Sequence, residues 1–336
     1  MQTLGESKER WKRLGEEALG RIGMSWREVN ALRCSYHTFT RRKRSGEIRF
    51  LHVPDPELKE VQHRLLRHVF RLLPVHRAAK GFVRNRSIVN HAYPHIGKRY
   101  VLTCDIADFF PSTKAERIHE FFTEDLGWSL SITEQIVRLV CLPRKQCLPQ
   151  GAPTSPILAN IVNRRMDARL AAFARKHHLD YSRYADDLAF SPIAHGGADA
   201  HPRFVLSVVG QILSDFDYAL RPDKCRIQRP HTRQLVTGLV VNTKCGLPRD
   251  VRRRLRAAVH RHKYNRRLSS PAKAGEEEGM STEALHSWIA YRKMVLTQQR
   301  RQHAYRLIQE SQVPKQDDTK KQEVATGTVS APPPPT

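Results

Sequence analysis

The sequence has no apolar run that approaches the roughly 18 residues that a membrane-spanning helix requires. Its first residues, MQTLGESKERWKRLGEE, carry charges with no apolar core behind them, so they do not resemble a secretory signal. The six cysteines form no CxxC pair, and Cys141 and Cys147 have no histidine spaced for zinc. We therefore expect reduced thiols in a cytoplasmic protein, with no membrane as a partner.

Acidic residues are scarce relative to basic ones. The 336-residue chain has 33 Asp and Glu against 58 Lys and Arg, a formal charge of +25. Such an excess of positive charge attracts polyanions, so nucleic acid is the expected partner and an acidic membrane the weaker alternative. A hydrophobic content of 40% is still enough for a buried core, in one to three domains.

The chain has no internal repeat, and its character changes along its length. We predict a helical N-terminal region over 1–46, an α+β body over 47–245, a basic helical region over 246–310 and a disordered tail over 311–336. The expected strands cover 47–53, 99–105 and 234–242, a strand–turn–strand unit covers 180–192, and the expected helices cover 56–73, 132–141, 156–176, 204–216, 249–267 and 282–309.

Three carboxylates are the candidate catalytic residues. Asp105 ends an expected strand, while Asp186 and Asp187 occupy the turn of the strand–turn–strand unit. Adjacent carboxylates between hydrophobic strands repel each other unless a cation lies beside them. Mg²⁺ prefers oxygen ligands, and a pair of Mg²⁺ ions can activate a hydroxyl group and neutralise a triphosphate. Taken alone, the turn could also be an ordinary surface turn, because aspartate is common in turns.

Three motifs occur together in an order that resembles the reverse transcriptases. CDIADFFPS at 104–112 resembles motif A, LPQGAPTSPILAN at 148–160 resembles motif B, and YADD at 184–187 resembles motif C. The resemblance implies an RNA-directed DNA polymerase with a right-hand fold of fingers and palm, followed by a C-terminal helical thumb. It also implies two Mg²⁺ ions, with four residues as their ligands: Asp105, Asp186, the assisting Asp187 and the carbonyl group of Ile106.

Phe110 is the expected determinant of sugar selectivity. It lies five residues after Asp105, where the resemblance implies the steric gate of the family. A bulky ring at this position would collide with a ribose 2′-hydroxyl group, so the enzyme should prefer dNTPs. The alternative is an ordinary aromatic residue of the core.

The resemblance implies further dNTP-binding residues. Gln150 and Gly151 match residues that line the dNTP pocket. Lys224 falls where motif D has a lysine near the leaving pyrophosphate, as a general acid, although a plain surface lysine is the alternative. Arg84 and Arg86 lie where residues of the fingers approach the triphosphate.

Two short signatures narrow the resemblance to bacterial retron reverse transcriptases. The segment HAYPH at 91–95 resembles the N-A-x-x-H signature of that family, except that His91 stands where Asn is expected. A Val-Thr-Gly triplet follows motif D, as in retron enzymes. The resemblance covers about residues 25–310, and its signatures imply four RNA-binding residues: His95, Val236, Thr237 and Gly238.

The region after Gly246 carries the densest positive charge. Residues 249–267 have nine Arg and Lys against the single acidic Asp250. Charge on all sides of a helix favours phosphate contacts on more than one flank, although a merely soluble basic helix is the alternative. Five residues are the expected RNA contacts of this helix: Arg249, Arg252, Arg253, Arg254 and Arg256.

The retron resemblance implies a defined biology. Such an enzyme binds a structured non-coding RNA from its own locus, primes from a guanosine 2′-hydroxyl group and makes branched multicopy single-stranded DNA. The family acts in antiphage defence with an effector or toxin protein encoded nearby. About 90 residues after Val241 leave little room for an RNase H domain, so removal of the template should depend on the RNase H of the host.

Two other interpretations stay open from the sequence. One is a reverse transcriptase of the group II intron, CRISPR-linked or abortive-infection type. The other is a non-catalytic RNA-binding scaffold that restrains a toxin. The intact carboxylates argue against the scaffold, since a protein that only binds a polyanion gains nothing from clustered negative charge.

Overall fold

The computed structural model describes residues 4–42, 46–193, 200–268 and 282–312. The centre of the molecule is an antiparallel sheet in the order β4-β5-β3-β6. Its strands are short, and the two inner ones are almost fully buried. They are β3 (Val101–Asp105), β4 (Leu179–Tyr184), β5 (Asp187–Pro192) and β6 (Arg226–Gln228).

One face of this sheet is covered by helices and forms the main core. Successive side chains of a strand point to opposite faces, so Leu102, Leu188 and Phe190 share the covered face. Apolar residues of the helices pack against them. The helices of this layer include α9 (Ser155–Val162), α10 (Arg164–Lys176) and α11 (Pro202–Ser214).

The other face of the sheet is only partly covered. Val101 and Ala189 pack there against a second, smaller core. Its cover comes from four elements, α5 (Ile88–Ala92), the 3₁₀ turn η2 (Tyr93–His95), the hairpin of β7 (Leu235–Val236) with β8 (Leu239–Val240), and α13 (Thr282–Gln312). We call this side the open face, because the catalytic end of the sheet is not covered by these elements.

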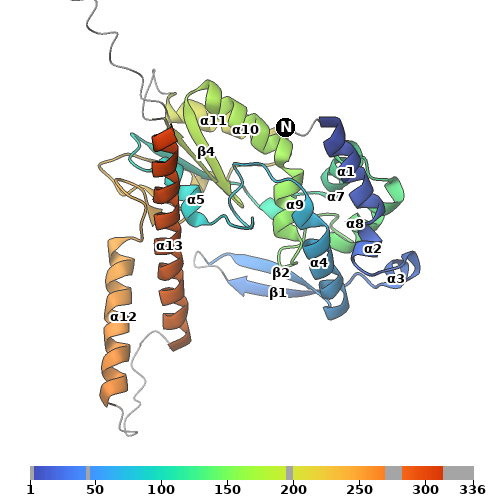
Figure 1. The fold of residues 1–336 in the computed structure, drawn as a ribbon, viewed down its shortest axis with the longest axis horizontal. Helices are drawn as coiled ribbons and strands as arrows, with labels where there is room; N and C mark the ends of the chain where they lie inside the picture. The colour runs from blue at the N-terminus through green and yellow to red at the C-terminus, as the bar shows by residue number, and fades with distance from the viewer. Residues whose placement is uncertain (1–3, 43–45, 194–199, 269–281, 313–336) are drawn as a thin grey trace, which may run out of the picture.

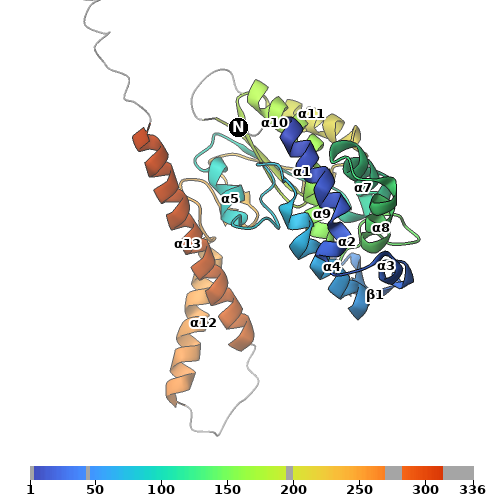
Figure 2. The same ribbon diagram turned by 45° about the vertical axis from the view of Figure 1, so that its right-hand side comes forward.

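The N-terminal half adds helices and a hairpin around the main core. Figures 1 and 2 show α1 and α2 beside α7 and α8, on the side of the molecule away from α13. The bounds are α1 (Leu4–Glu16), α2 (Ala18–Arg21), α3 (Trp26–Ala31), β1 (Tyr36–Arg42), β2 (Ile48–Pro54), α4 (Pro56–His68), η1 (Phe70–Leu72), α6 (Phe109–Ser112), α7 (Ala115–Glu120), η3 (Phe121–Asp125), α8 (Leu130–Val140) and η4 (Pro222–Lys224).

Two long helices follow the sheet region. α12 (Arg249–Leu268) and α13 lie side by side in both views and contact each other. α13 is anchored to the second core through Val295, which is almost fully buried. In the part of the chain that the structure describes, no helix is long and apolar enough to cross a membrane.

The structure changes three expectations about elements. The predicted helical region over 1–46 is too long, because β1 occupies Tyr36–Arg42 and pairs with β2. The helix predicted over 156–176 is two helices that meet at Asn163. The strand predicted over 234–242 is the tight hairpin of β7 and β8, since Thr237 and Gly238 have positive φ angles of 46° and 79°. Most of the predicted disordered tail, 313–336, lies outside the described residues.

Candidate active site

The three predicted carboxylates meet at one end of the sheet. Asp105 ends β3 and pairs in register with Asp187, the first residue of β5. Asp186 lies in the turn before β5, and its carbonyl oxygen accepts a hydrogen bond of 3.0 Å from the backbone nitrogen of Ile106. Asp105 and Asp187, which are 82 positions apart in the sequence, are therefore neighbours, as expected for a shared site.

The electrostatics of this cluster favour a cation. Burial and the neighbouring carboxylates raise the pKa of Asp187 to about 7. Burial and Asp105 also raise the pKa of Asp186. The main counter-charge is Lys224, whose Nζ lies 2.8 Å from Oδ2 of Asp105. Arg221 lies farther from Asp105, with its Nε at 3.8 Å from Oδ1, and the three carboxylates still repel one another enough to raise the pKa of Asp186 and Asp187.

These carboxylates suit Mg²⁺ better than a transition metal. Among the described residues, no group of three or more His, Cys, Asp or Glu side chains forms a ready-made metal cage. Mg²⁺ does not need such a cage, since it is usually held by one or two carboxylates together with water and substrate phosphates. Burial and the mutual repulsion of Asp105, Asp186 and Asp187 raise the pKa of Asp187, and a divalent cation would relieve that repulsion, so the residues present fit this ion.

The turn that carries Asp186 is held from the covered face by a buried ion pair. Arg183 and Asp167 have fully buried side chains, with Nη2 2.6 Å and Nε 2.8 Å from the two carboxylate oxygens. The remaining guanidinium nitrogen, Nη1, donates to the carbonyl oxygen of Ala185 at 3.0 Å. Ala185 has a left-handed φ of 57°, so this bond stabilises a backbone conformation that alanine rarely adopts.

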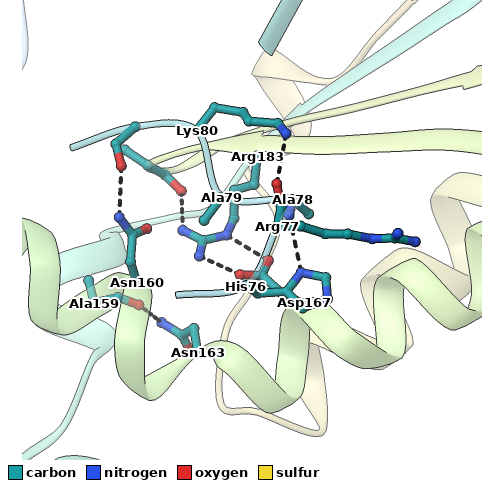
Figure 3. A network of polar contacts seen from close by, with 12 residues as sticks. His76, Arg77, Ala78, Ala79, Lys80, Ala159, Asn160, Asn163, Asp167 and Arg183 are labelled. Atoms are coloured by element: carbon teal, nitrogen blue, oxygen red, sulfur yellow. Dashed lines mark hydrogen bonds and ion pairs between the residues drawn. The ribbon is translucent and has the colours of Figure 1, made fainter. Parts of the chain in front are cut away.

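A second segment, residues 76–81, lies against the same turn. Figure 3 shows Arg183 at the centre of this network, between Asp167 and the backbone of the segment. The backbone of Lys80 donates to the carbonyl oxygen of Arg183 at 2.7 Å, and Asn160 donates to that of Gly81 at 2.7 Å. A Cβ atom on Gly81 would lie 2.9 Å from the nitrogen of Ala185, so this close approach requires glycine.

A hollow of about 180 Å³ opens beside the carboxylates; we call it the Phe110 hollow. Asp105, Asp186 and Ile106 line it, and so do Phe110 and Lys224. These residues were predicted separately as metal ligands, steric gate and pyrophosphate neighbour, and the structure brings them together. Gln150, from the predicted dNTP-binding set, lines the same hollow.

The backbone of Gln150 and Gly151 is fixed to the β1–β2 hairpin. The carbonyl oxygen of Gln150 accepts a hydrogen bond of 2.8 Å from the nitrogen of His52. Gly151 has a φ of +128°, and a Cβ atom there would lie 3.0 Å from the carbonyl oxygen of His52. Gly151 is thus required by its conformation and by this close contact, whereas Gln150 faces the hollow.

Sequence reasoning missed three cations of the Phe110 hollow, Arg49, Lys145 and Arg221. Arg221 could have been found, because it lies three residues before Lys224 and residues three apart share one side of a 3₁₀ turn. Its Nε lies 3.8 Å from Oδ1 of Asp105. Arg49 on β2 and Lys145 after α8 had no comparable signal, since only the folded chain brings them to the hollow.

The two arginines predicted near the triphosphate lie elsewhere. Arg86 is half-buried, and its Nη1 donates to the carbonyl oxygens of His76 and Ala79. Arg84 is exposed. Neither lines the Phe110 hollow in this structure. The reason is that these bonds of Arg86 hold the 76–81 segment together instead of pointing a cation at the site.

The retron signature residues lie on the open face, but they are not equally accessible. His95 is fully buried, with Nδ1 2.7 Å from Oγ of Ser191 and Nε2 2.8 Å from Oγ of Ser182. It therefore has no surface for the RNA contact predicted from the sequence. Val236 is also fully buried and belongs to the second core. Thr237 and Gly238 form the hairpin turn and line a separate cavity near Asp187.

The predicted RNA-binding arginines of α12 are exposed. Arg249 and Arg252 also line a groove of about 420 Å³ between the hairpin region, α12 and α13, together with Lys244 and Arg292. Among the described residues that line this groove there is no acidic side chain. The other exposed arginines of the predicted set are Arg253, Arg254 and Arg256.

Comparison with protein families identifies the class of protein to which this sheet and carboxylate cluster belong. The family model for reverse transcriptase (RNA-dependent DNA polymerase) matches residues 41–252. That segment contains the central sheet, the three carboxylates and the Phe110 hollow.

Individual curated proteins show to which group of reverse transcriptases the chain is similar. The retron Mx65 and Mx162 reverse transcriptases of Myxococcus xanthus are 38% and 37% identical to this chain, with 67% and 72% of it covered. The retron Ec86 reverse transcriptase of Escherichia coli is 33% identical, over 67% of this chain and 69% of its own length. The chain belongs to the retron reverse transcriptases, which confirms the resemblance inferred from the motifs. It spans 55% and 54% of the two Myxococcus relatives.

Proposed function

We propose that this chain is an RNA-directed DNA polymerase that copies part of a structured retron RNA into DNA. The observation that carries the proposal is the meeting of Asp105, Asp186 and Asp187 at one end of the sheet, beside a hollow that is also lined by lysine and arginine side chains. A binding protein for a polyanion gains nothing from carboxylates placed there, whereas nucleotidyl transfer requires them. Membership of the retron family supports the same activity.

The three carboxylates and the carbonyl group of Ile106 would hold two Mg²⁺ ions. When bound, such ions neutralise charge on a triphosphate and make a hydroxyl group more nucleophilic. The chain itself orients these ligands, because register pairing fixes Asp105 against Asp187. Lys224 would leave Asp105 for the pyrophosphate as negative charge develops there, since its Nζ is now 2.8 Å from that carboxylate.

The Phe110 hollow would receive the incoming dNTP. Arg49, Lys145 and Arg221 give it three cations that a triphosphate can contact. Phe110 would exclude a ribose 2′-hydroxyl group by collision, and Gln150 would lie against the nucleotide. Arg84 and Arg86 could reach the triphosphate only if the 76–81 segment changed its hydrogen bonds, so they are the weakest members of the set.

The chain would divide into the fingers, palm and thumb of a right-hand polymerase. Residues 47–245 would form fingers and palm, with the central sheet in the palm, and the fingers would also include β1, which precedes residue 47 and pairs with β2. Residues 246–310, with α12 and α13, would form the thumb. The exposed arginines of α12 and the turn of Thr237 and Gly238 would contact the RNA through phosphate and ribose groups.

The retron family suggests how synthesis starts and what it yields. A guanosine 2′-hydroxyl group of the RNA would attack the first dNTP, and the product would be branched multicopy single-stranded DNA. Positioning of a secondary hydroxyl group would then supply much of the rate enhancement. Host RNase H would remove the copied template, and a nearby effector protein would link the complex to antiphage defence.

The test is the nucleic acid that accompanies the purified protein. The chain expressed with its neighbouring non-coding DNA should copurify with a branched RNA–DNA species, and RNase should leave one discrete short DNA. The double variant Asp186→Ala, Asp187→Ala should contain no such DNA and should still bind the RNA. Persistence of the same DNA in the double variant would show that these carboxylates are not the catalytic ones.

A further inference from the structure

A second cavity lies on the open face, on the other side of the carboxylates from the Phe110 hollow. It has a volume of about 320 Å³, and its wall includes His91, Thr103, Asp187 and Thr237; we call it the His91 cavity. Asp105 and Asp186 line the Phe110 hollow, whereas Asp187 lines the His91 cavity. The carboxylate cluster therefore separates two spaces.

The two spaces suit the two reactants of nucleotidyl transfer. In phosphoryl transfer the attacking and leaving oxygens lie roughly in line through the phosphorus atom. If the Phe110 hollow holds the dNTP, the attacking hydroxyl group must come from across the carboxylates. The His91 cavity is the space that opens there, so it is where the last nucleotide of the primer would lie.

A buried chain of hydrogen bonds leads to this cavity. Ser191 contacts Nδ1 of His95 at 2.7 Å, and Nε2 of His95 contacts Oγ of Ser182 at 2.8 Å. The same Ser182 oxygen lies 2.8 Å from Nδ1 of His91 and 3.0 Å from the carbonyl oxygen of His91. Burial lowers the pKa of both histidines, so both rings are neutral and each carries one proton.

The donors and acceptors of this chain can be assigned by counting protons. Ser182 has one hydroxyl proton, and the carbonyl oxygen of His91 can only accept, so Ser182 donates to it. His91 and His95 must then each donate to the oxygen of Ser182. His91 therefore carries its proton on Nδ1, and its Nε2 is an unprotonated acceptor.

This acceptor has no partner within the chain. Among the described residues, none donates to Nε2 of His91, and the Nδ1 edge of the ring is turned to Ser182. His91 is only 1% exposed, but unlike His95 it lines a cavity and has one ring nitrogen, Nε2, without a partner in the described part of the chain, so Nε2 is the polar ring atom that it can offer there. Thr237 on the same wall has a buried hydroxyl oxygen without a partner, at a φ of 46° that is strained for a β-branched residue.

We propose that Nε2 of His91 accepts a hydrogen bond from the ribose 2′-hydroxyl group of the primer's last nucleotide when the 3′-hydroxyl group of that nucleotide attacks the dNTP. A terminal ribonucleotide is then favoured over a terminal 2′-deoxynucleotide in this reaction. This assignment rests on the proposed polymerase activity. A neutral imidazole nitrogen beside the carboxylates accepts from a hydroxyl group without adding charge. A 2′-deoxy terminus offers no such donor and would leave Nε2 unpaired.

The experiment compares two primers on one RNA template, identical except for a ribo or a 2′-deoxy terminal nucleotide. For each primer, the rate of the first dNTP addition, divided by the primer concentration, is measured with the full chain and Mg²⁺. The unmodified protein should favour the ribo terminus about tenfold, the effect of one hydrogen bond to an acceptor that is otherwise left unpaired. His91→Phe keeps the ring volume and should reduce this ratio to about one, while extension of the deoxy primer continues.

Two matched variants separate this role from a structural one. Ser182 keeps the carbonyl oxygen of residue 91 and His95 as partners in His91→Phe, so the fold should survive. His91→Gln places an amide oxygen near the position of Nε2 and should keep most of the ribo preference. If His91→Phe lowers both rates equally, or leaves the ratio unchanged, the assignment is wrong. If the unmodified protein extends neither primer, the proposed polymerase activity fails and this assignment fails with it.

Discussion

The two faces of the central sheet differ in how their buried charges are compensated. On the covered face, the Arg183 guanidinium group bonds both oxygens of Asp167, and the hydroxyl group of Tyr181 donates to the same carboxylate at 2.7 Å. On the open face, three carboxylates share the nearby Lys224 as their closest cation. The covered face satisfies its charges within the chain, whereas the open face leaves charge for a ligand to neutralise.

The difference shows how one sheet serves both stability and catalysis. An ion pair with no exposed surface must be fully hydrogen-bonded, because either partner alone would be a buried charge without compensation. The carboxylate cluster is tolerated because it lies at a sheet end beside two solvent-connected hollows. Substitutions on the covered face should therefore affect folding, and those on the open face should affect activity.

The largest expected effect is on activity at the open face. Asp105→Asn should reduce dNTP incorporation roughly a thousandfold or more, since several kcal/mol of charge stabilisation are lost with one metal ligand. The free energy of unfolding without divalent ions should change little, because relief of the repulsion on Asp186 and Asp187 offsets the lost ion pairs with Lys224 and Arg221. Primer extension measures the dNTP incorporation, and urea denaturation of the same preparation measures the free energy of unfolding. A large loss of stability would remove the distinction between the faces.

The next effect is on stability at the covered face. Arg183→Met should lower the free energy of unfolding by about 3–5 kcal/mol, because Asp167 would remain as a buried, uncompensated charge. Adding Asp167→Leu should recover most of the loss, since no charge is then buried. Denaturant unfolding of the two variants gives the comparison. Equal stability of both variants would mean that the pair is less isolated from water than its burial indicates.

A smaller effect, on the selectivity between dNTPs and rNTPs, is expected at Phe110. Phe110→Val should leave dNTP incorporation largely intact and increase rNTP incorporation roughly 10- to 100-fold, because 1–3 kcal/mol of steric discrimination is lost. Single-nucleotide addition with matched dNTP and rNTP substrates measures the ratio. Phe122→Leu is the control, since Phe122 is fully buried in the main core and does not line the Phe110 hollow. An unchanged ratio in Phe110→Val would assign Phe110 to the core.

The smallest expected effect is a pH dependence of stability that arises from Asp187 on the open face. The folded pKa of Asp187 is about 7, above the usual value of 3.8, so the folded state binds more protons between these values. Its contribution to stability is therefore present at low pH and is lost as pH rises through about 7. Without divalent ions, the melting temperature should fall less over this range in Asp187→Asn than in the unmodified protein.

The effect of Mg²⁺ on the melting temperature should also depend on pH. Because it binds the ionised carboxylates, Mg²⁺ should raise the melting temperature more at pH 8 than at pH 6. In Asp187→Asn this difference should shrink, whereas Arg183→Met should keep it despite its lower stability. A Mg²⁺ effect that is independent of pH would contradict the raised pKa of Asp187.

Some of the site could be predicted from the sequence and some could not. The motifs at 104–112, 148–160 and 184–187 identified Asp105, Asp186, Phe110 and Gln150, which do meet at one hollow. Their roles depend on residue types at short, fixed spacings, which a sequence displays directly. His95 was misassigned, because the same signature does not show whether a histidine faces solvent or the interior.

The sequence by itself determined the class of protein, the candidate catalytic carboxylates and the basic character of the last helices. The tertiary structure alone decided which distant residues complete the site. Arg49 and Lys145 reach the Phe110 hollow from separate segments. His91 and His95 meet Ser182 and Ser191 across 87 to 96 residues of chain. Strand register and alternation set these encounters, and a shift by one residue would move every side chain to the other face.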